Sequence, residues 1–254
     1  MAHQPNPIPA YDPYAQGSNT NQTGIDPYND NGLSSKLSTD SRMGFIRKVY
    51  GILCAQLCLT AGYLIVVTRD PQSFQRFYQN HLPLVFVAIF IYMITLYAIG
   101  CYKSVARKVP LNYILLFLFT ASMSFICGVS VSFSEPQDVM IAAIMTCSIV
   151  IGLTAYAVTT KTDFSYCNAF MWGLVICVLC ATFLSIFIHS RLLSIWISAL
   201  VVLLLCVFII YDTQLIIGKH SLKYSIDDYV FAAMVIYIDI MRLFLEILKI
   251  LGKK

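Results

Sequence analysis

The chain has 254 residues, of which 58% are hydrophobic and only 12% are charged, and its mean hydropathy is +0.73. This composition argues against a soluble fold and indicates that a lipid bilayer surrounds the protein. The formal net charge is only +4, and the basic residues gather in short loops, which argues against nucleic-acid binding. Nine cysteines, an odd number mostly placed in or beside apolar segments, argue against a secreted disulfide framework.

Residues 1–44 are rich in Pro, Asn, Gln, Ser and Tyr and contain few branched aliphatic residues that could build a core. We predict a disordered cytosolic tail, which either recruits a partner through its Pro and Tyr residues or is only a solvated leader. The order of residues expected of a cleaved signal peptide is missing from this stretch, so the first span is expected to direct the chain to the membrane.

Residues 45–254 contain seven apolar segments, each about as long as a helix that crosses the bilayer. Because backbone amides in lipid must be paired within their own segment, each segment is predicted to be a helix. The sequence therefore predicts an all-α polytopic membrane protein with about seven transmembrane helices. A capping box of Ser225 and Asp228 is expected to open the last helix. The predicted segments are 46–67, 83–101, 111–132, 139–159, 169–188, 195–217 and 229–251.

The distribution of Lys and Arg predicts a cytosolic N-terminus, because that orientation puts the larger number of basic residues on the cytosolic side. An odd number of complete spans then places the C-terminus on the other side, whereas a re-entrant last segment would return it to the cytosol. The basic residues counted as cytosolic are Lys36, Arg42, Arg47, Lys48, Lys103, Arg107, Lys108, Lys161, Lys219 and Lys223.

Two acidic residues, Asp212 and Asp239, lie within the sixth and seventh segments. A charged group at the centre of a membrane helix costs about 2.5–3.5 kcal/mol on insertion scales, so such residues require a reason. The two segments are antiparallel neighbours joined by a short loop, and both aspartates lie within a few turns of that loop. We therefore expect the two carboxyl groups to lie at similar depth and close together.

Two adjacent carboxyl groups in a low dielectric do not both ionise readily, so one proton is held tightly and the pair is a candidate pH sensor. When protonated, the pair can share a hydrogen bond that holds the helices together. When deprotonated, the carboxylates repel each other and can transiently coordinate Ca²⁺ through oxygen. The alternative is that each aspartate only forms a hydrogen bond with a neighbouring helix.

Arg242 and Glu246 follow Asp239 on one face of the last segment and form a candidate charge ladder. Arg242 is a candidate latch that neutralises Asp239, or it reaches towards the membrane interface and pairs with Glu246. Hydroxyl residues in the third and fourth segments either line an ion path or only pack helices together. They are Ser124, Ser130, Ser132, Thr146, Ser148 and Thr154.

Several separate motifs in one order resemble the transmembrane Bax inhibitor motif family, most closely its Lifeguard branch. The resemblance extends from about residue 41 to 251. The matching stretches are Val49–Leu57, Val109–Thr120, Thr160–Ser165, Tyr211–Gly218, Asp228–Tyr229 and Tyr237–Ile240.

The resemblance implies a seven-helix fold with a central last helix, a pH-dependent calcium leak from internal stores, and a cytoprotective, anti-apoptotic role. The endoplasmic reticulum and the Golgi are the membranes that it favours. The paired aspartates of the family fall on Asp212 and Asp239. Some relatives hold this pair with an arginine in the second span, whereas residues 83–101 of this chain contain no basic side chain.

Two other functions compete with the calcium leak. One is a non-conducting membrane regulator that acts through membrane-protein partners. The other is an intramembrane aspartyl protease. The Tyr211-Asp212 sequence fits such an enzyme, but this chain lacks the Gly-x-Gly-Asp sequence that such enzymes have at the position of Asp239. The sequence thus predicts no catalytic residues and no tightly bound cofactor. Ca²⁺ is expected as the permeant ion, and protons and membrane lipids as the other ligands.

Overall fold

The computed structural model describes residues 27–162, 168–188, 190–218 and 224–252, with side chains described from residue 40 onward except at 168–169. Residues 1–39 and 40–254 form two separate units, and the following description concerns the second unit. Every regular element in the described part of this unit is helical. The elements are α1 (Pro27–Arg69, shared by both units), α2 (Pro71–Asn80), α3 (Leu82–Cys101), α4 (Lys103–Arg107), α5 (Leu111–Ser132), α6 (Pro136–Thr159), α7 (Asn168–Phe187), α8 (Arg191–Ile217), the 3₁₀ helix η2 (Ile226–Asp228) and α9 (Tyr229–Leu251).

Six of the described helices are long and apolar enough to cross a membrane, which confirms an all-α polytopic membrane protein. The seventh predicted span coincides with α9, which is 23 residues long. Its ionisable residues Asp239, Arg242, Glu246 and Lys249 leave it too polar to qualify as a span by composition alone. The six spans are Asp40–Arg69, Leu82–Cys101, Leu111–Ser132, Pro136–Thr159, Phe170–Phe187 and Arg191–Ile217.

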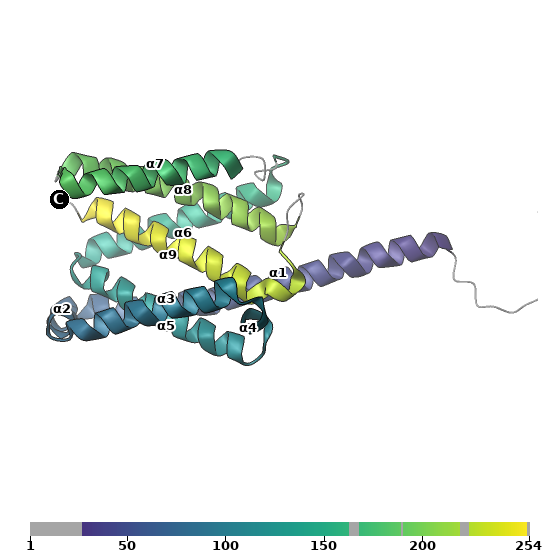
Figure 1. Cartoon of the computed structure of the whole chain (residues 1–254), viewed down its shortest axis with the longest axis horizontal. Helices are drawn as coiled ribbons and strands as arrows, with labels where there is room; N and C mark the ends of the chain where they lie inside the picture. Colours follow the sequence, from purple (N-terminus) through teal and green to yellow (C-terminus); the bar gives the residue numbers. More distant parts are fainter. Residues whose placement is uncertain (1–26, 163–167, 189, 219–223, 253–254) are drawn as a thin grey trace, which may run out of the picture. The chain divides into compact units, whose positions relative to one another are not determined.

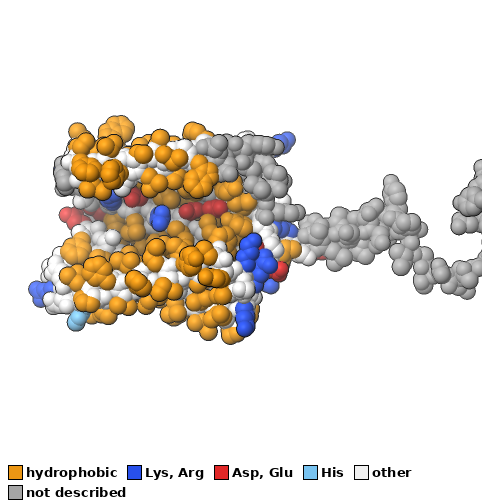
Figure 2. All heavy atoms as spheres, viewed as in Figure 1, with side chains coloured by type: hydrophobic (Ala, Val, Ile, Leu, Met, Phe, Trp, Pro, Cys, Tyr) orange, Lys and Arg blue, Asp and Glu red, His pale blue; other side chains and the backbone are white. Residues whose placement is uncertain are grey.

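The outer surface of the bundle is apolar, as a surface that contacts lipid must be. Large side chains such as Phe90 of α3 and Trp172 of α7 are 71% and 63% exposed. Figure 2 shows hydrophobic side chains covering the visible faces of the upper and lower helices. Exposed apolar area on this scale is unfavourable in water and matches a bilayer environment.

Helix α9 lies between two groups of helices, with α7 and α8 on one side and α3 and α5 on the other (Figure 1). It packs against α8 and α6 and also against α5 and α3. Thirteen of its 23 residues are buried. The central position of the last helix, which the family resemblance implied, is therefore confirmed.

The predicted capping box at the start of the last helix is wrong. Ser225 makes no side-chain capping bond, and it precedes the short helix η2 instead of α9. The carboxylate of Asp228 accepts hydrogen bonds from Arg107 of α4, with Nε at 2.8 Å and Nη2 at 3.1 Å, so it joins η2 to α4 and does not cap α9. This hydrogen bond raises the pKa of the Arg107 guanidinium.

Several sequence predictions fall on residues outside the described ranges. These are most of the predicted tail, part of the stretch Thr160–Ser165, and the basic residues Lys219 and Lys223. The predicted disordered tail and the cytosolic N-terminus therefore stay predictions.

Candidate functional site

The structure brings Asp212 of α8 and Asp239 of α9 together inside the bundle. Their carboxyl groups lie close enough to interact, and they can share a hydrogen bond when one of them carries a proton. Their residues are only 7% and 8% exposed. Oδ2 of Asp239 is buried without a hydrogen-bond partner among the described residues. The site is thus a two-carboxyl cluster with spare acceptor capacity in a region of low dielectric.

The two aspartates meet because they flank one connection between antiparallel neighbours. Asp212 lies five residues before the end of α8 at Ile217, and Asp239 lies ten residues after the start of α9 at Tyr229. At 1.5 Å per residue, these distances bring the two side chains to depths that differ by about one helical turn. The proximity expected from the sequence is observed.

Tyr224, in the connection between α8 and α9, contacts the pair from outside the spans. Its hydroxyl donates a hydrogen bond of 3.3 Å to Oδ1 of Asp212. Its ring packs edge-on against Phe231 of α9, with a centroid distance of 5.8 Å. Burial, reinforced by the neighbouring Asp212 carboxyl, raises the pKa of Tyr224, so its hydroxyl remains a donor over the physiological pH range.

Arg42, near the start of the first span, binds the end of α8 and the connection after it. Its guanidinium donates to the carbonyl oxygens of Leu215 at 2.6 Å, Ile217 at 3.3 Å and Tyr224 at 2.6 Å. The last carbonyls of a helix have no partner in the helix and carry its negative dipole end, so a cation is well placed there. Arg42 therefore fastens α1 to the segment that carries Tyr224.

Gly218 makes this arrangement possible. It ends α8 in the left-handed conformation, with φ at +67°, which glycine adopts without the penalty that a Cβ imposes. A Cβ at this position would lie 2.6 Å from three guanidinium atoms of Arg42. The last glycine of the Tyr211–Gly218 motif is therefore required both by the backbone turn and by the close approach of Arg42.

Arg42 and Tyr224 were not predicted as site residues from the sequence. Arg42 was counted only as a charge that sets orientation, and Tyr224 had no motif of its own. Their contacts with each other and with α8 join residues 12 to 182 positions apart, so no local pattern could reveal most of them. The one available signal was that the second span lacks the arginine that holds the aspartate pair in some relatives. This absence indicated that another residue could stabilise the region around Asp212 and Asp239.

Arg242 and Glu246 line a cavity of about 650 Å³ between α7, α8 and α9, together with Trp172, Phe208 and Tyr211 among others. Within the described residues, no ion pair joins Arg242 to Asp239 or to Glu246. Glu246 instead lies 3.5 Å from Lys249. Arg242 is near enough to Asp239 for an electrostatic interaction. Figure 2 shows charged side chains in the band between the two apolar surfaces, where Figure 1 places α9.

The hydroxyl side chains of α5 and α6 differ in what they bind. Thr146 donates to the carbonyl of Ala142 in its own helix, which fits the packing interpretation. Ser124 of α5 instead lies 2.8 Å from Thr60 Oγ1 of α1, which lies 2.7 Å from the hydroxyl of Tyr237 in α9. This buried polar node joins three helices two residues before Asp239.

No group of three or more potential metal-ligating side chains is found among the described residues. The aspartate pair brings together two carboxyl groups, and ionised carboxylate oxygen is a ligand type that hard cations such as Ca²⁺ prefer.

Comparison with known proteins places the chain in a family. The family described as "Inhibitor of apoptosis-promoting Bax1" matches residues 42–254. Protein LIFEGUARD 1 of Arabidopsis thaliana is 37% identical over 224 residues, which are 85% of this chain and 92% of that protein. Protein lifeguard 3 of Homo sapiens is 31% identical over 84% of this chain and 70% of its own length. The Golgi anti-apoptotic protein of Vaccinia virus (strain Lister) is 33% identical over 89% of this chain and 92% of its own length. The chain therefore belongs to the Bax inhibitor family and is a multi-pass membrane protein of its Lifeguard type.

Proposed function

We propose that this protein is a pH-sensitive calcium leak channel of internal membranes, gated by the pair of Asp212 and Asp239, with a cytoprotective, anti-apoptotic role. The observation that carries the proposal is the close approach of two buried carboxyl groups from neighbouring membrane helices. Ionisable residues at membrane depth are expensive and commonly mark ion or proton pathways.

The protonation state of the pair sets the distance between α8 and α9. With one proton shared, the carboxyl groups attract each other and hold the two helices in contact. After that proton leaves, two neighbouring negative charges repel each other strongly, because the surroundings have a low dielectric. A calcium ion relieves this repulsion, and the unpartnered Oδ2 of Asp239 is an acceptor that it can use.

Arg42 and Tyr224 hold the entrance closed in this mechanism. The bonds from Arg42 to Leu215 and Tyr224 fix the connection over the end of α8, and Tyr224 contacts Asp212 beneath it. Ions that reach the pair from this side require these contacts to loosen. The role of a latch, which the sequence suggested for Arg242, is therefore shared in our proposal with Arg42.

Arg242 and Glu246 then act as charge partners beside the path. Arg242 lies one turn from Asp239 and offsets part of the charge that appears on deprotonation, while Glu246 faces the same cavity. Among the described residues, no ion pair joins Arg242 to Glu246, so Arg242 is available to respond to Asp239.

The relatives support the cellular part of the proposal. One of them bears the name Golgi anti-apoptotic protein. We propose the Golgi or the endoplasmic reticulum as the location, with the N-terminus in the cytosol, and suppression of cell death through a lowered calcium content of that store.

The experiment that tests the proposal is Ca²⁺ flux into dye-loaded proteoliposomes over a series of pH values. We expect the native chain to pass more Ca²⁺ as the pH rises through the titration of the pair. Asp212→Asn, Asp239→Asn and the double variant are expected to flatten this dependence. Asp227→Asn is the matched control, because Asp227 is an exposed acid near the same loop.

Other outcomes would favour the competing functions. A native chain that passes no Ca²⁺ at any pH but still protects cells would indicate a non-conducting regulator that acts through membrane-protein partners. Cleavage of a helical reporter substrate that stops in the Asp212→Asn variant would indicate an intramembrane protease.

A further inference from the structure

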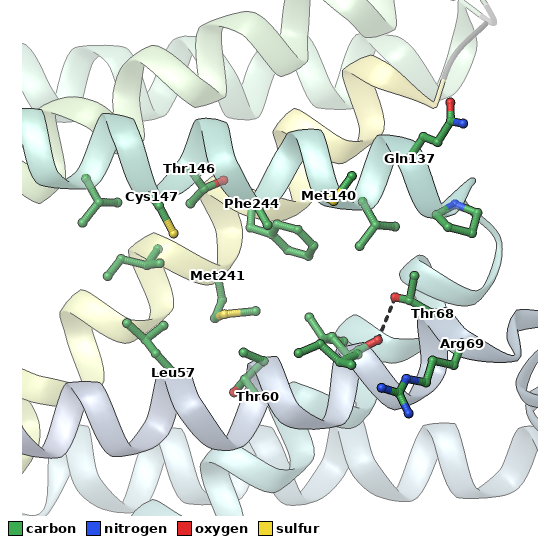
Figure 3. A pocket seen from close by; sticks show the side chains of 18 of the residues that line it. Leu57, Thr60, Thr68, Arg69, Gln137, Met140, Thr146, Cys147, Met241 and Phe244 are labelled. Carbon is green, nitrogen blue, oxygen red and sulfur yellow. Dashed lines mark hydrogen bonds between the residues drawn. The ribbon is translucent and has the colours of Figure 1, made fainter.

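A second cavity, on the side of the bundle formed by α1 and α6, is a groove of about 750 Å³ with an almost entirely apolar lining. Its walls are α1 and α6, and its floor is formed by Ile240, Met241 and Phe244 of α9 (Figure 3). These three floor residues belong to the buried core, with exposed fractions of 7%, 4% and 6%, and the groove reaches their side chains. The groove therefore gives an apolar molecule access to the central helix.

The polar atoms along the groove are already bonded within the protein. Thr68 donates to the carbonyl of Leu64 at 2.7 Å, and Thr146 donates to that of Ala142 at 2.7 Å. Thr60 belongs to the polar node with Ser124 and Tyr237. The walls thus present no unsatisfied polar group to an occupant along the length of the groove.

The mouth of the groove is different. Arg69 is the last residue of α1, and Gln137 is the second residue of α6. Figure 3 shows both at one end of the groove, while Leu57 and Cys147 lie at the other. Within the described residues, neither Arg69 nor Gln137 forms a hydrogen bond or ion pair through its side chain. An unpaired guanidinium at the end of an apolar groove can bind an anionic group.

The charges around this mouth have both signs. Glu135 is exposed and directly precedes Pro136, a residue that lines the groove. Asp70 follows Arg69, but its carboxylate accepts the backbone N–H of Ser73 at 3.2 Å and caps α2. A head group that carries a phosphate for Arg69 and an amine for Glu135 complements this arrangement better than a purely anionic one.

The length of the groove matches one leaflet of a membrane. From Leu57 to Arg69 the wall rises about 18 Å at 1.5 Å per residue, which is close to half of the roughly 30 Å hydrocarbon core. A partner transmembrane helix would require a groove across both leaflets. We propose that this groove binds a zwitterionic phospholipid, with one acyl chain against Met241 and Phe244 and the phosphate at Arg69.

The test uses the full-length protein in liposomes that contain phosphatidylcholine with a photoreactive diazirine near the end of one acyl chain. After illumination, the labelled residues are located by proteolysis and mass spectrometry. We expect label on Met241 or Phe244 of α9 in addition to residues of the outer surface. Label confined to outward residues such as Phe90 or Trp172 would overturn the proposal.

Variants that fill the groove provide the first control. Ala61→Phe and Ala143→Phe each place a ring in the groove from one wall, and both positions are exposed, so the fold should tolerate them. We expect the label on α9 to fall about tenfold in both, since little of the chain-binding volume remains. Ala155→Phe, on a part of α6 outside the groove, should leave it unchanged. Equal loss in all three variants, or no loss in either filled variant, would overturn the proposal.

The contribution of the phosphate is tested with a photoreactive diacylglycerol that has the same acyl chains. We expect phosphatidylcholine to label α9 roughly two- to fivefold more than diacylglycerol, as an exposed ion pair allows. Arg69→Gln should abolish this difference, while Arg76→Gln, an exposed arginine of α2, should preserve it. A difference that survives Arg69→Gln would remove the assignment of the phosphate site. Since the readout is labelling, the test is independent of calcium conduction.

Discussion

The hydroxyl of Tyr224 lies 3.3 Å from Oδ1 of Asp212, so a residue of the α8–α9 connection touches one member of the buried carboxyl pair. Through its backbone carbonyl, the same residue accepts a hydrogen bond of 2.6 Å from Arg42. A chain of contacts therefore leads from α1 through Tyr224 to the pair.

Tyr224→Phe should move the pH dependence of Ca²⁺ flux to higher pH. The hydroxyl donates to Asp212 and stabilises its ionised form, so without it the carboxyl loses its proton less readily. We expect a shift of roughly half a pH unit, a typical magnitude for one hydrogen bond to a charged group at this length. Flux over a pH series in proteoliposomes measures it. Tyr97→Phe is the control because Tyr97 is 61% exposed on α3, and equal curves for native and Tyr224→Phe chains would contradict the prediction.

Arg42→Gln should increase the flux at pH values where the native channel is closed. The variant loses charge-assisted bonds to the carbonyls of Leu215, Ile217 and Tyr224, which together hold the connection in place. We also expect a destabilisation of about 2 kcal/mol, seen as a lower melting temperature in detergent. Arg47→Gln is the matched control, since Arg47 is exposed one turn further along α1. A variant that melts early without leaking would show that the clamp supports only the fold.

Gly218→Ala should have the same effects as Arg42→Gln. Alanine in the left-handed conformation costs about 1–2 kcal/mol, and its Cβ would also displace the Arg42 guanidinium from 2.6 Å. Because both changes disrupt the same Arg42 contacts, the double variant should be less destabilised than the sum of the two single variants and should leak no more than either of them. Gly152→Ala is the control, since nothing lies within 4 Å of a Cβ there. Fully additive leaks would separate the glycine from the clamp.

The helices were predictable because the bilayer restricts the choices. The predicted segments 111–132 and 229–251 coincide with α5 and α9, and the segments predicted for α3, α6, α7 and α8 differ from these helices by a few residues at the ends. The first segment differs more, because α1 begins at Pro27 and the segment was predicted to begin at residue 46. In lipid a long apolar segment must pair its own backbone, so hydropathy and length determine the element. The meeting of Asp212 and Asp239 was predictable for a related reason, since a short connection between antiparallel helices fixes their relative depth.

The elements outside the apolar segments were harder to predict. Helix α2 is amphipathic and only ten residues long, yet Asp70 followed by Pro71 is a recognisable start, with the carboxylate as the cap and proline in the first turn. Asp228 appeared to be a capping residue, but an arginine of α4 far away in the sequence binds it. Here a long-range ion pair replaced the local bond, and a single sequence does not reveal such competition.

Tyr237→Phe should reduce stability without changing the pH dependence of flux. Its hydroxyl lies 2.7 Å from Thr60 Oγ1 in the node that joins α1, α5 and α9, and its side chain is fully buried. Thr60 keeps its contact with Ser124 at 2.8 Å, so the variant should lose only about 1 kcal/mol, the usual value for one buried hydrogen bond. Melting in detergent and the flux–pH curve, measured on the same preparation, distinguish the two effects. If Tyr237→Phe shifted the curve as far as Tyr224→Phe does, the node would be part of the sensor, because a purely structural contact two residues before Asp239 has no reason to alter proton release from the pair.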